Sequence, residues 1–332
     1  MQTYCALLND KRFIYKHLEL SRERLIRVHY HKSFQFINLE TLSVSSHLQS
    51  PSDINSMIHC DGLLLCEFDF TNKVRKRLAV WNPFLSQVKW IKPSSSYTGL
   101  DIYGFGYDNT SRDNYKILRF CNEIGYEEVE IYEFKSQLWR NVDYSCAYCW
   151  HSSLDQAMSM NGNMFWIAQR QKKSKTENFI QSFDFSREVF KETCCVPLQT
   201  RDLFLSGFGG DRLSFLSQHE QGKMIQVWVT NKVTDDVVSW SKYFNMTPQY
   251  LSILFGCGYF SFPAHLIHKT NRIMLWWEEE DAKNKDIYVN VYEIGEGVVE
   301  KQVETGRHGR CDQAPFRSRC CVFVPSLVPV PE

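Results

Sequence analysis

Short apolar runs separated by turn residues follow one another along most of the chain. In the clearest group, Asp61-Gly62 precedes three leucines, and the next apolar run ends at the turn pair Asn82-Pro83. Residues 87–91 then alternate polar and apolar side chains. Runs of this kind, bounded by Gly, Pro, Asn or Asp, predict β-strands joined by tight turns. A few such strands cannot bury their apolar faces alone, so the group is expected to recur.

Four successive groups of strands close on an aromatic residue, and these aromatic residues are evenly spaced. The spacings are 49, 51 and 50 residues between Trp90, Trp139, Phe190 and Trp240. A period of about fifty residues with several short strands per unit is typical of a blade in a kelch-like β-propeller. The repeat therefore predicts an all-β fold.

The last unit of the repeat and the two ends of the chain are less regular. Residues 273–277 and 287–292 predict strands, and the charged residues 278–286 are expected to form a loop that lengthens this unit. Two more apolar runs lie at residues 34–39 and 320–324. We expect them to share one blade, because pairing strands from both ends closes the ring and leaves no exposed edge. The prediction is a propeller of about six blades, within a range of about five to seven.

Tryptophans recur in the predicted strands at positions where blades would pack on one another. Burial of a large side chain contributes roughly 1.5–3 kcal/mol, so packing alone accounts for their placement and no ligand is needed. The predicted blade anchors are Trp81, Trp90, Trp139, Trp228, Trp240 and Trp276. The pairs Asp61-Gly62 and Asn161-Gly162 are predicted to form hairpin or strand-entry turns.

Composition narrows the range of partners. The formal net charge is zero, from 38 basic and 38 acidic residues, so bulk charge predicts neither nucleic acid nor a membrane as a partner. Since the chain shows no leader and no apolar run of roughly eighteen residues, we expect it to be intracellular, in the nucleus or the cytoplasm. The 12 cysteines are expected to be reduced thiols, because a core this large needs no disulfide framework.

Cysteines and histidines give a weak signal for a metal. Cys146 and Cys149, with His151 nearby, have the spacing of half a zinc site. His308 and Cys311 are the residues that could complete it, but no second Cys-x-x-Cys or paired histidine occurs. No metal and no cofactor are therefore predicted.

The charged runs favour solvated loops over catalytic or nucleic-acid sites. Arg170, Lys172, Lys173 and Lys175 form a basic cluster between strand runs, where a loop is expected. The acidic residues 278–281 are interpreted in the same way, since nothing separates the pKa values of adjacent exposed carboxylates. No Gly-x-Ser-x-Gly or His-Glu-x-x-His motif occurs, so no enzyme is indicated. A propeller glycosidase or oxidase remains an alternative, which requires titratable side chains converging from several blades.

The first thirty residues differ from the rest of the chain. Phe13, Ile14, Leu18 and Leu25 recur with helical period among charged residues, with Asn9 or Asp10 placed to begin the helix. The sequence predicts one amphipathic helix here.

Specific motifs then resemble a known family. Residues 5–18 resemble the last part of a plant F-box, and the chain that follows resembles the type 1 F-box-associated domain of plant F-box proteins. The matching stretches are residues 60–65, 80–83, 103–108, 115–117, 183–185 and 322–329. The resemblance implies residual F-box in residues 1–30 and an F-box-associated, kelch-like propeller in residues 31–330.

The resemblance implies a non-catalytic substrate-recognition subunit of a Skp-cullin-F-box E3 ubiquitin ligase. Such a subunit binds a Skp-type adaptor, and through it a cullin, and presents an unknown target protein for ubiquitination. The candidate adaptor contacts are Leu7, Leu8, Phe13 and Leu18. The front of an F-box has no counterpart before Met1, so these residues could instead pack the helix onto the propeller, and a truncated protein that binds a target without joining a ligase is the alternative.

Target-binding residues are not identified by the sequence. Propeller binding faces are built from loops whose sequence follows the partner. The predicted loops span residues 93–98, 109–113, 169–177 and 278–285.

Overall fold

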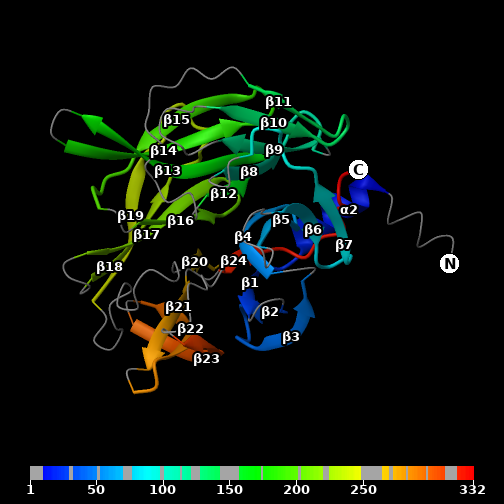
Figure 1. Cartoon of the computed structure of the whole chain (residues 1–332). Helices are drawn as coiled ribbons and strands as arrows, with labels where there is room; N and C mark the ends of the chain where they lie inside the picture. Colours follow the sequence, from blue (N-terminus) through cyan, green and yellow to red (C-terminus); the bar gives the residue numbers. More distant parts are fainter. Residues whose placement is uncertain are drawn as a thin grey trace. The chain divides into compact units, whose positions relative to one another are not determined.

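The computed structural model describes the chain in stretches that cover the repeat. They are residues 10–29, 33–50, 53–69, 77–97, 101–112, 114–120, 128–142, 157–172, 175–200, 203–219, 224–247, 264–268, 272–281, 283–296, 298–310 and 320–332. Within them the strands form six four-stranded sheets, the six blades of a β-propeller, and one helix lies near the N-terminus (Figure 1). The predicted all-β propeller is confirmed.

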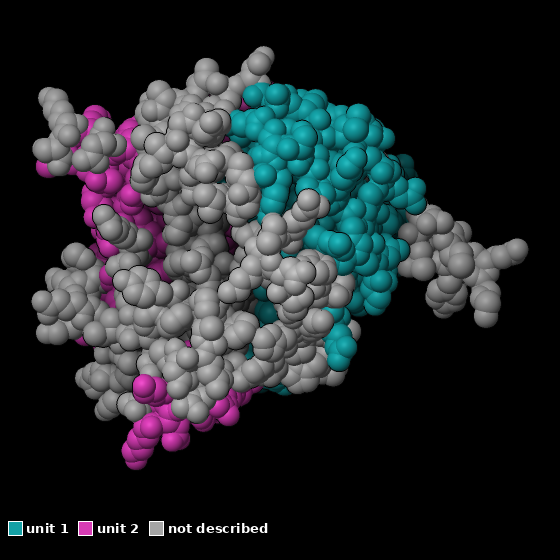
Figure 2. All heavy atoms as spheres, viewed as in Figure 1, with its two compact units in different colours: residues 1–144, 321–332 teal, residues 145–320 magenta. Residues whose placement is uncertain are grey.

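The chain divides into two compact units, which Figure 2 distinguishes by colour. The first unit comprises residues 1–144 and 321–332, and the second comprises residues 145–320.

The first unit holds three blades and helix α2 (Lys11–Leu20). Its first blade has the strand order β24 (Cys320–Phe323), β1 (Arg24–His29), β2 (Ser33–Asn38) and β3 (Val44–Gln49). The second consists of β4 (Asp53–Cys60), β5 (Leu63–Asp69), β6 (Arg77–Asn82) and β7 (Gln87–Ile91). The third consists of β8 (Ile102–Tyr107), β9 (Tyr115–Phe120), β10 (Val129–Glu133) and β11 (Leu138–Asn141). Since β2 and β24 lie in one blade, the predicted sharing of a blade by both ends of the chain is confirmed.

The second unit holds three further blades in chain order. The fourth blade consists of β12 (Met158–Met160), β13 (Asn163–Lys172), β14 (Lys175–Asp184) and β15 (Val189–Cys195). The fifth consists of β16 (Leu203–Phe208), β17 (Arg212–His219), β18 (Met224–Thr230) and β19 (Trp240–Met246). The sixth consists of β20 (Ala264–Ile267), β21 (Ile273–Asp281), β22 (Asp286–Gly295) and β23 (Val298–Arg310). Strands β7, β11, β15 and β19 carry the evenly spaced closing aromatics, so the fifty-residue repeat corresponds to whole blades.

Three sequence predictions of local structure are corrected. The helix ends at Leu20, where Ser21 donates its N–H to the carbonyl of His17, and Leu25 lies in β1 instead of in the helix. Residues 278–281 are the end of β21, and residues 169–172 and 175–177 belong to β13 and β14. In both hairpins cross-strand pairing continues beyond the apolar part. The ladder is formed by backbone hydrogen bonds, so charged side chains that face solvent do not interrupt it.

Both predicted Asx-Gly pairs form tight turns in which the two residues have positive φ. Asp61 and Gly62 have φ angles of 52° and 82°, and Asn161 and Gly162 have φ angles of 50° and 75°. Two successive residues with positive φ are the mark of the type I′ turn, whose twist matches antiparallel strands. Both turn predictions are confirmed.

The chain after β24 is bound to the second blade by the side chains of Asn82 and His59. Asn82, which is fully buried, donates from Nδ2 to the carbonyls of Ser326 and Val328 at 3.1 and 2.7 Å. Nε2 of His59 accepts hydrogen bonds from the N–H of Gly62 at 2.9 Å and of Val324 at 3.3 Å. The C-terminal segment is therefore part of the core of the first unit.

Substitution of Gly62 tests this close approach. Gly62 and Gly210 have nearly equal φ angles, 82° and 80°. A Cβ at Gly62 would lie 2.0 Å from Cβ of Ser326, whereas one at Gly210 meets no described atom within 4 Å. We expect Gly210→Ala to cost about 1 kcal/mol, from backbone strain alone, and Gly62→Ala to cost about 2 kcal/mol more because the C-terminal segment must move. Urea unfolding of both variants measures the difference, and equal losses would contradict the packing described.

The two bonds to His59 predict a dependence of stability on pH. Burial lowers the pKa of His59 from 6.5 to about 4. The unfolded chain therefore takes up the proton first, so stability falls as the pH is lowered from about 6.5 to about 4 and is constant above that range. In His59→Gln the amide oxygen can still accept a hydrogen bond but does not titrate. Between about pH 7.5 and pH 5 we expect the unmodified chain to lose about 1–2 kcal/mol more than His59→Gln, measured by urea unfolding. Parallel losses would show that His59 is protonated in the fold.

Candidate functional site

Helix α2 is docked on the first unit through its apolar face. Asp10 begins the helix by accepting a hydrogen bond from the N–H of Arg12, and Ile14 and Leu18 are buried in one core cluster with Leu63, Leu65 and Val328. The helix thus contacts the core of the second blade and the C-terminal segment.

Arg112 fixes the helix from the loop between β8 and β9. Its Nε donates to Asp61 Oδ2 at 2.9 Å, and its guanidinium lies 4.7 Å from the ring centroid of Tyr15. The hydroxyl of Tyr15 in turn donates to the carbonyl of Arg112 at 3.0 Å. One residue therefore joins the helix to the Asp61-Gly62 turn.

Two of the four predicted adaptor contacts lie on this helix, on different sides of it. Leu7 and Leu8 lie outside the described residues. Leu18 is buried by the propeller, whereas Phe13 is 40% exposed. Within the described helix, Phe13 and Leu20 are the large apolar side chains that face solvent. Contact with an adaptor stays a prediction for all four residues.

The six predicted blade anchors differ in burial. Trp81 and Trp276 are buried, and Trp139 is half-buried with its Nε1 donating to the carbonyl of Lys92. Trp90 is 41% exposed, although its ring centroid lies 5.0 Å from that of Phe68.

Two of the anchors share one partner in the second unit. The ring centroids of Trp228 and Trp240 lie 6.2 and 4.7 Å from the ring centroid of Phe215. The sequence reasoning did not single out Trp166 and Trp277, which are also buried. The spacing rule found only tryptophans that recur near the ends of the apolar runs.

The basic cluster is a hairpin held by ion pairs. Arg170 lies 2.5 Å from Glu177 on β14 and 2.6 Å from Glu192 on β15. Lys172 and Lys175 are exposed, and Lys173 lies outside the described residues. The charge of Arg170 is therefore neutralised by carboxylates of its own blade.

The residues of the candidate zinc site are not described. Cys146, Cys149, His151 and Cys311 lie outside the described residues, as does the side chain of His308. Among the residues that are described, no group of three His, Cys, Asp or Glu side chains could hold a metal. No described helix is long and apolar enough to cross a membrane.

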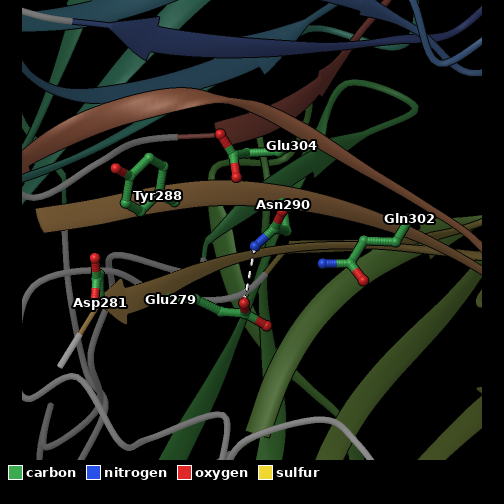
Figure 3. Close-up of a pocket in the computed structure, with 6 residues that line it drawn as sticks. All are labelled: Glu279, Asp281, Tyr288, Asn290, Gln302 and Glu304. Atoms are coloured by element: carbon green, nitrogen blue, oxygen red, sulfur yellow. Dashed lines mark hydrogen bonds between the residues drawn. The ribbon is translucent and has the colours of Figure 1, made fainter. Parts of the chain in front are cut away.

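A pocket lies on the face of the last blade, where β21, β22 and β23 extend together. It encloses about 410 Å³, within the range of small-ligand sites. We call it the acidic pocket, and its lining is Glu279, Asp281, Tyr288, Asn290, Gln302 and Glu304 (Figure 3). Strand alternation produces it: Tyr288 and Asn290 point to one face of β22, while Val289 and Val291 are buried on the other.

A hydrogen-bond chain orients the floor of the acidic pocket. Gln302 Nε2 donates to the hydroxyl of Tyr292 at 3.1 Å, and that hydroxyl donates to Glu279. Nδ2 of Asn290 donates to the other oxygen of Glu279 at 3.0 Å (Figure 3). Burial, together with the Glu279 carboxylate, raises the pKa of Tyr292, so the hydroxyl remains the donor.

Charge in the acidic pocket is not compensated by cations. Elsewhere in the same blade Arg272 pairs with Glu293 and Glu300 at 2.6 and 2.5 Å. Within the described part of the chain, the carboxylates of the acidic pocket have no such salt-bridge partner. This site was not predicted from the sequence, because residues 278–281 are charged and were expected to form a loop. The signal that was available is the alternation of Tyr288, Asn290 and Tyr292.

Comparison with known proteins identifies the family of this chain. The family described as the F-box associated β-propeller domain matches residues 15–330. The chain belongs to the F-box-associated β-propeller family. Two relatives from Arabidopsis thaliana are F-box/WD-40 repeat-containing protein 1, 41% identical over 99% of this chain and 82% of its own, and F-box protein At3g08750, 40% identical over 98% and 89%. The predicted resemblance is confirmed.

The propeller architecture extends to distant proteins. The crystal structure of TolB from Acinetobacter baumannii aligns with a TM-score of 0.50 over 90% of this chain and 66% of TolB, at 10% identity. This similarity is one of fold alone. Function in the F-box-associated family has to be argued from the nearer relatives.

The docking of α2 predicts unequal effects from two leucines. Leu18 is 8% exposed and Leu20 is 72% exposed, on the same helix. We expect Leu18→Ala to destabilise the first unit by about 2–3 kcal/mol and Leu20→Ala by less than about 0.5 kcal/mol, because only the former leaves a cavity. Urea unfolding and hydrogen exchange of the helix amides measure both. A helix that exchanges equally fast in the two variants would show that Leu18 does not hold it on the propeller.

Proposed function

We propose that this chain is the substrate-recognition subunit of a Skp-cullin-F-box type E3 ubiquitin ligase. The observation that carries the proposal is membership of the F-box-associated family across residues 15–330, with relatives named as F-box proteins that align over nearly the whole chain. In this role the propeller binds a target protein and the N-terminal region binds a Skp-type adaptor, which connects to a cullin. We place this assembly in the nucleus or the cytoplasm.

The docked helix supports a rigid link between the two activities. Ile14 and Leu18 pack into the propeller core, and Tyr15 bonds to the loop at Arg112. A receptor subunit has to hold its target in a fixed position relative to the adaptor, and a helix anchored in the same core as the propeller provides that. Among the described residues of the predicted adaptor contacts, we propose Phe13, which is 40% exposed, as the contact.

The role proposed is one of binding and not of catalysis. A Ser–His pair does occur, with Ser214 Oγ 3.1 Å from Nε2 of His265. However, Ser214 is fully buried and His265 is 2% exposed, so no substrate reaches them. Burial lowers the pKa of His265 to about 3, which leaves it neutral and structural. The carboxylates of the acidic pocket come from one blade and do not converge from several.

Co-precipitation with a purified plant Skp-type adaptor tests the proposal. We expect the chain to retain the adaptor and, through it, a cullin. Phe13→Ala should weaken retention several-fold, because exposed aromatic anchors dominate interfaces. Leu138→Ala, which truncates a 66% exposed apolar side chain outside the helix, should leave it unchanged.

A chimera with a complete F-box grafted before Cys5 separates the outcomes. If the chimera binds the adaptor and the chain alone does not, the chain is a target-binding module without the adaptor function, and the proposal is wrong for the chain as it stands. If neither binds, the ligase role is excluded altogether.

A further inference from the structure

The buried amide of Asn290 has an acceptor without a donor. Asn290 is 3% exposed, and its Oδ1 has no hydrogen-bond partner among the described residues. The amide cannot turn over to relieve this, because Nδ2 is bonded to Glu279 and rotation would bring an oxygen against that carboxylate. A buried acceptor left without a donor is unfavourable, so a donor from outside would stabilise it.

Carboxylates lie on both sides of this acceptor. Asn290 lies on the middle strand, between Glu279 on β21 and Glu304 on β23, and Glu304 is its direct cross-strand neighbour (Figure 3). Asp281 adds a third carboxylate to the lining. The Nδ2 and hydroxyl donors at the floor already serve Glu279. The acidic pocket therefore offers acceptors and negative charge to a ligand that brings several N–H donors.

The cation that could neutralise the acidic pocket from within the blade is engaged elsewhere. Arg307 stands opposite Tyr288 in the ladder, and its guanidinium forms an ion pair with Asp286 at 2.7 Å. The charge of the pocket is thus left for an external partner.

We propose that the acidic pocket binds the guanidinium of an arginine side chain on a partner protein. A guanidinium carries five N–H donors in a plane, which can serve the Asn290 oxygen and the Glu304 carboxylate together. The ring of Tyr288 gives its planar face a surface to lie on. A lysine ammonium brings a compact charge and three donors, which fits spread acceptors less well. A bare divalent cation is disfavoured because no described acidic group has a metal-binding arrangement.

The inference deepens the proposed function, on which it rests in one respect only. If the chain is a ligase receptor, the arginine belongs to an exposed basic segment of its target. The guanidinium site itself depends only on the geometry of β21, β22 and β23.

Titration of the full chain with a capped tripeptide, acetyl-Gly-Arg-Gly-amide, tests the site by isothermal calorimetry and NMR. We expect saturable binding with a dissociation constant of about 1 mM or below. The matching citrulline peptide has the same shape without the charge and should bind at least about 10-fold more weakly. Free agmatine, which carries the same guanidinium without a peptide backbone, shows whether the backbone contributes.

Charge reversal in the acidic pocket supplies the matched variants. Glu304 is exposed, so Glu304→Lys should fold normally and abolish binding, while Glu304→Gln should weaken it about 2–5-fold. Glu296, in the turn between β22 and β23, does not line the acidic pocket, and Glu296→Lys should change binding less than about twofold.

The proposal is overturned if the citrulline peptide binds as well as the arginine peptide, or if Glu304→Lys binds as the unmodified chain does. Displacement of the peptide by calcium chloride at equal ionic strength, with magnesium inert, would make this a calcium site instead and would also overturn it. Co-precipitation with the adaptor should be the same for Glu304→Lys and the unmodified chain. If the unmodified chain retains the adaptor but does not bind the arginine peptide, the result counts against this site alone. If it binds the arginine peptide but does not retain the adaptor, the result counts against the ligase role alone.

Discussion

The first unit depends on hydrogen bonds between the second blade and the segment that follows β24. Asn82 connects them: Oδ1 accepts from the N–H groups of Phe84 and Leu85 in the turn, while Nδ2 donates to two carbonyls of the C-terminal segment. Asn82 is fully buried, and its two bonds to the C-terminal carbonyls are buried as well, so these two are made in the absence of competing water. Losing the amide would leave two turn N–H groups and two carbonyls without their partner. Val328 then packs in the same cluster as Ile14 of the helix. Two sequence-distant segments are thus fixed by one asparagine.

The sequence was sufficient for the periodic parts of this structure. Each blade repeats the same pattern of strands and turns, so the pattern can be recognised along the chain. It is visible in the strand runs bounded by Asp61-Gly62 and Asn82-Pro83 and in the aromatics Trp90, Trp139 and Trp240. The turns at Gly62 and Gly162 require positive φ, a demand that Asx-Gly pairs meet at little cost. Propensity and pattern agree at these positions, so the local signal and the fold give the same answer.

What the sequence did not show arises from contacts across strands. Residues 278–281 are charged and read as a loop, yet Glu279 is positioned by bonds from Asn290 and Tyr292 on the next strand. Arg170 likewise joins strands β13, β14 and β15 through Glu177 and Glu192. Side chains that pair across a ladder lie at sequence separations set by hairpin length, which periodicity along a single strand does not encode. The acidic pocket could be recognised only once register was known.

The sharing of one blade by both ends of the chain sets a limit on how the protein is made. Strand β1 leaves the ribosome early, but its neighbour β24 is synthesised after five other blades. Until then β1 presents an unpaired edge next to the buried side chains Ile26 and Val28, the kind of surface that templates association with other chains. Closing this blade joins segments separated by nearly the whole sequence. Contacts between residues so far apart in sequence raise the contact order and form slowly. Completion of the first blade therefore waits until β24 has been synthesised, and during that interval the edge of β1 is open to other chains.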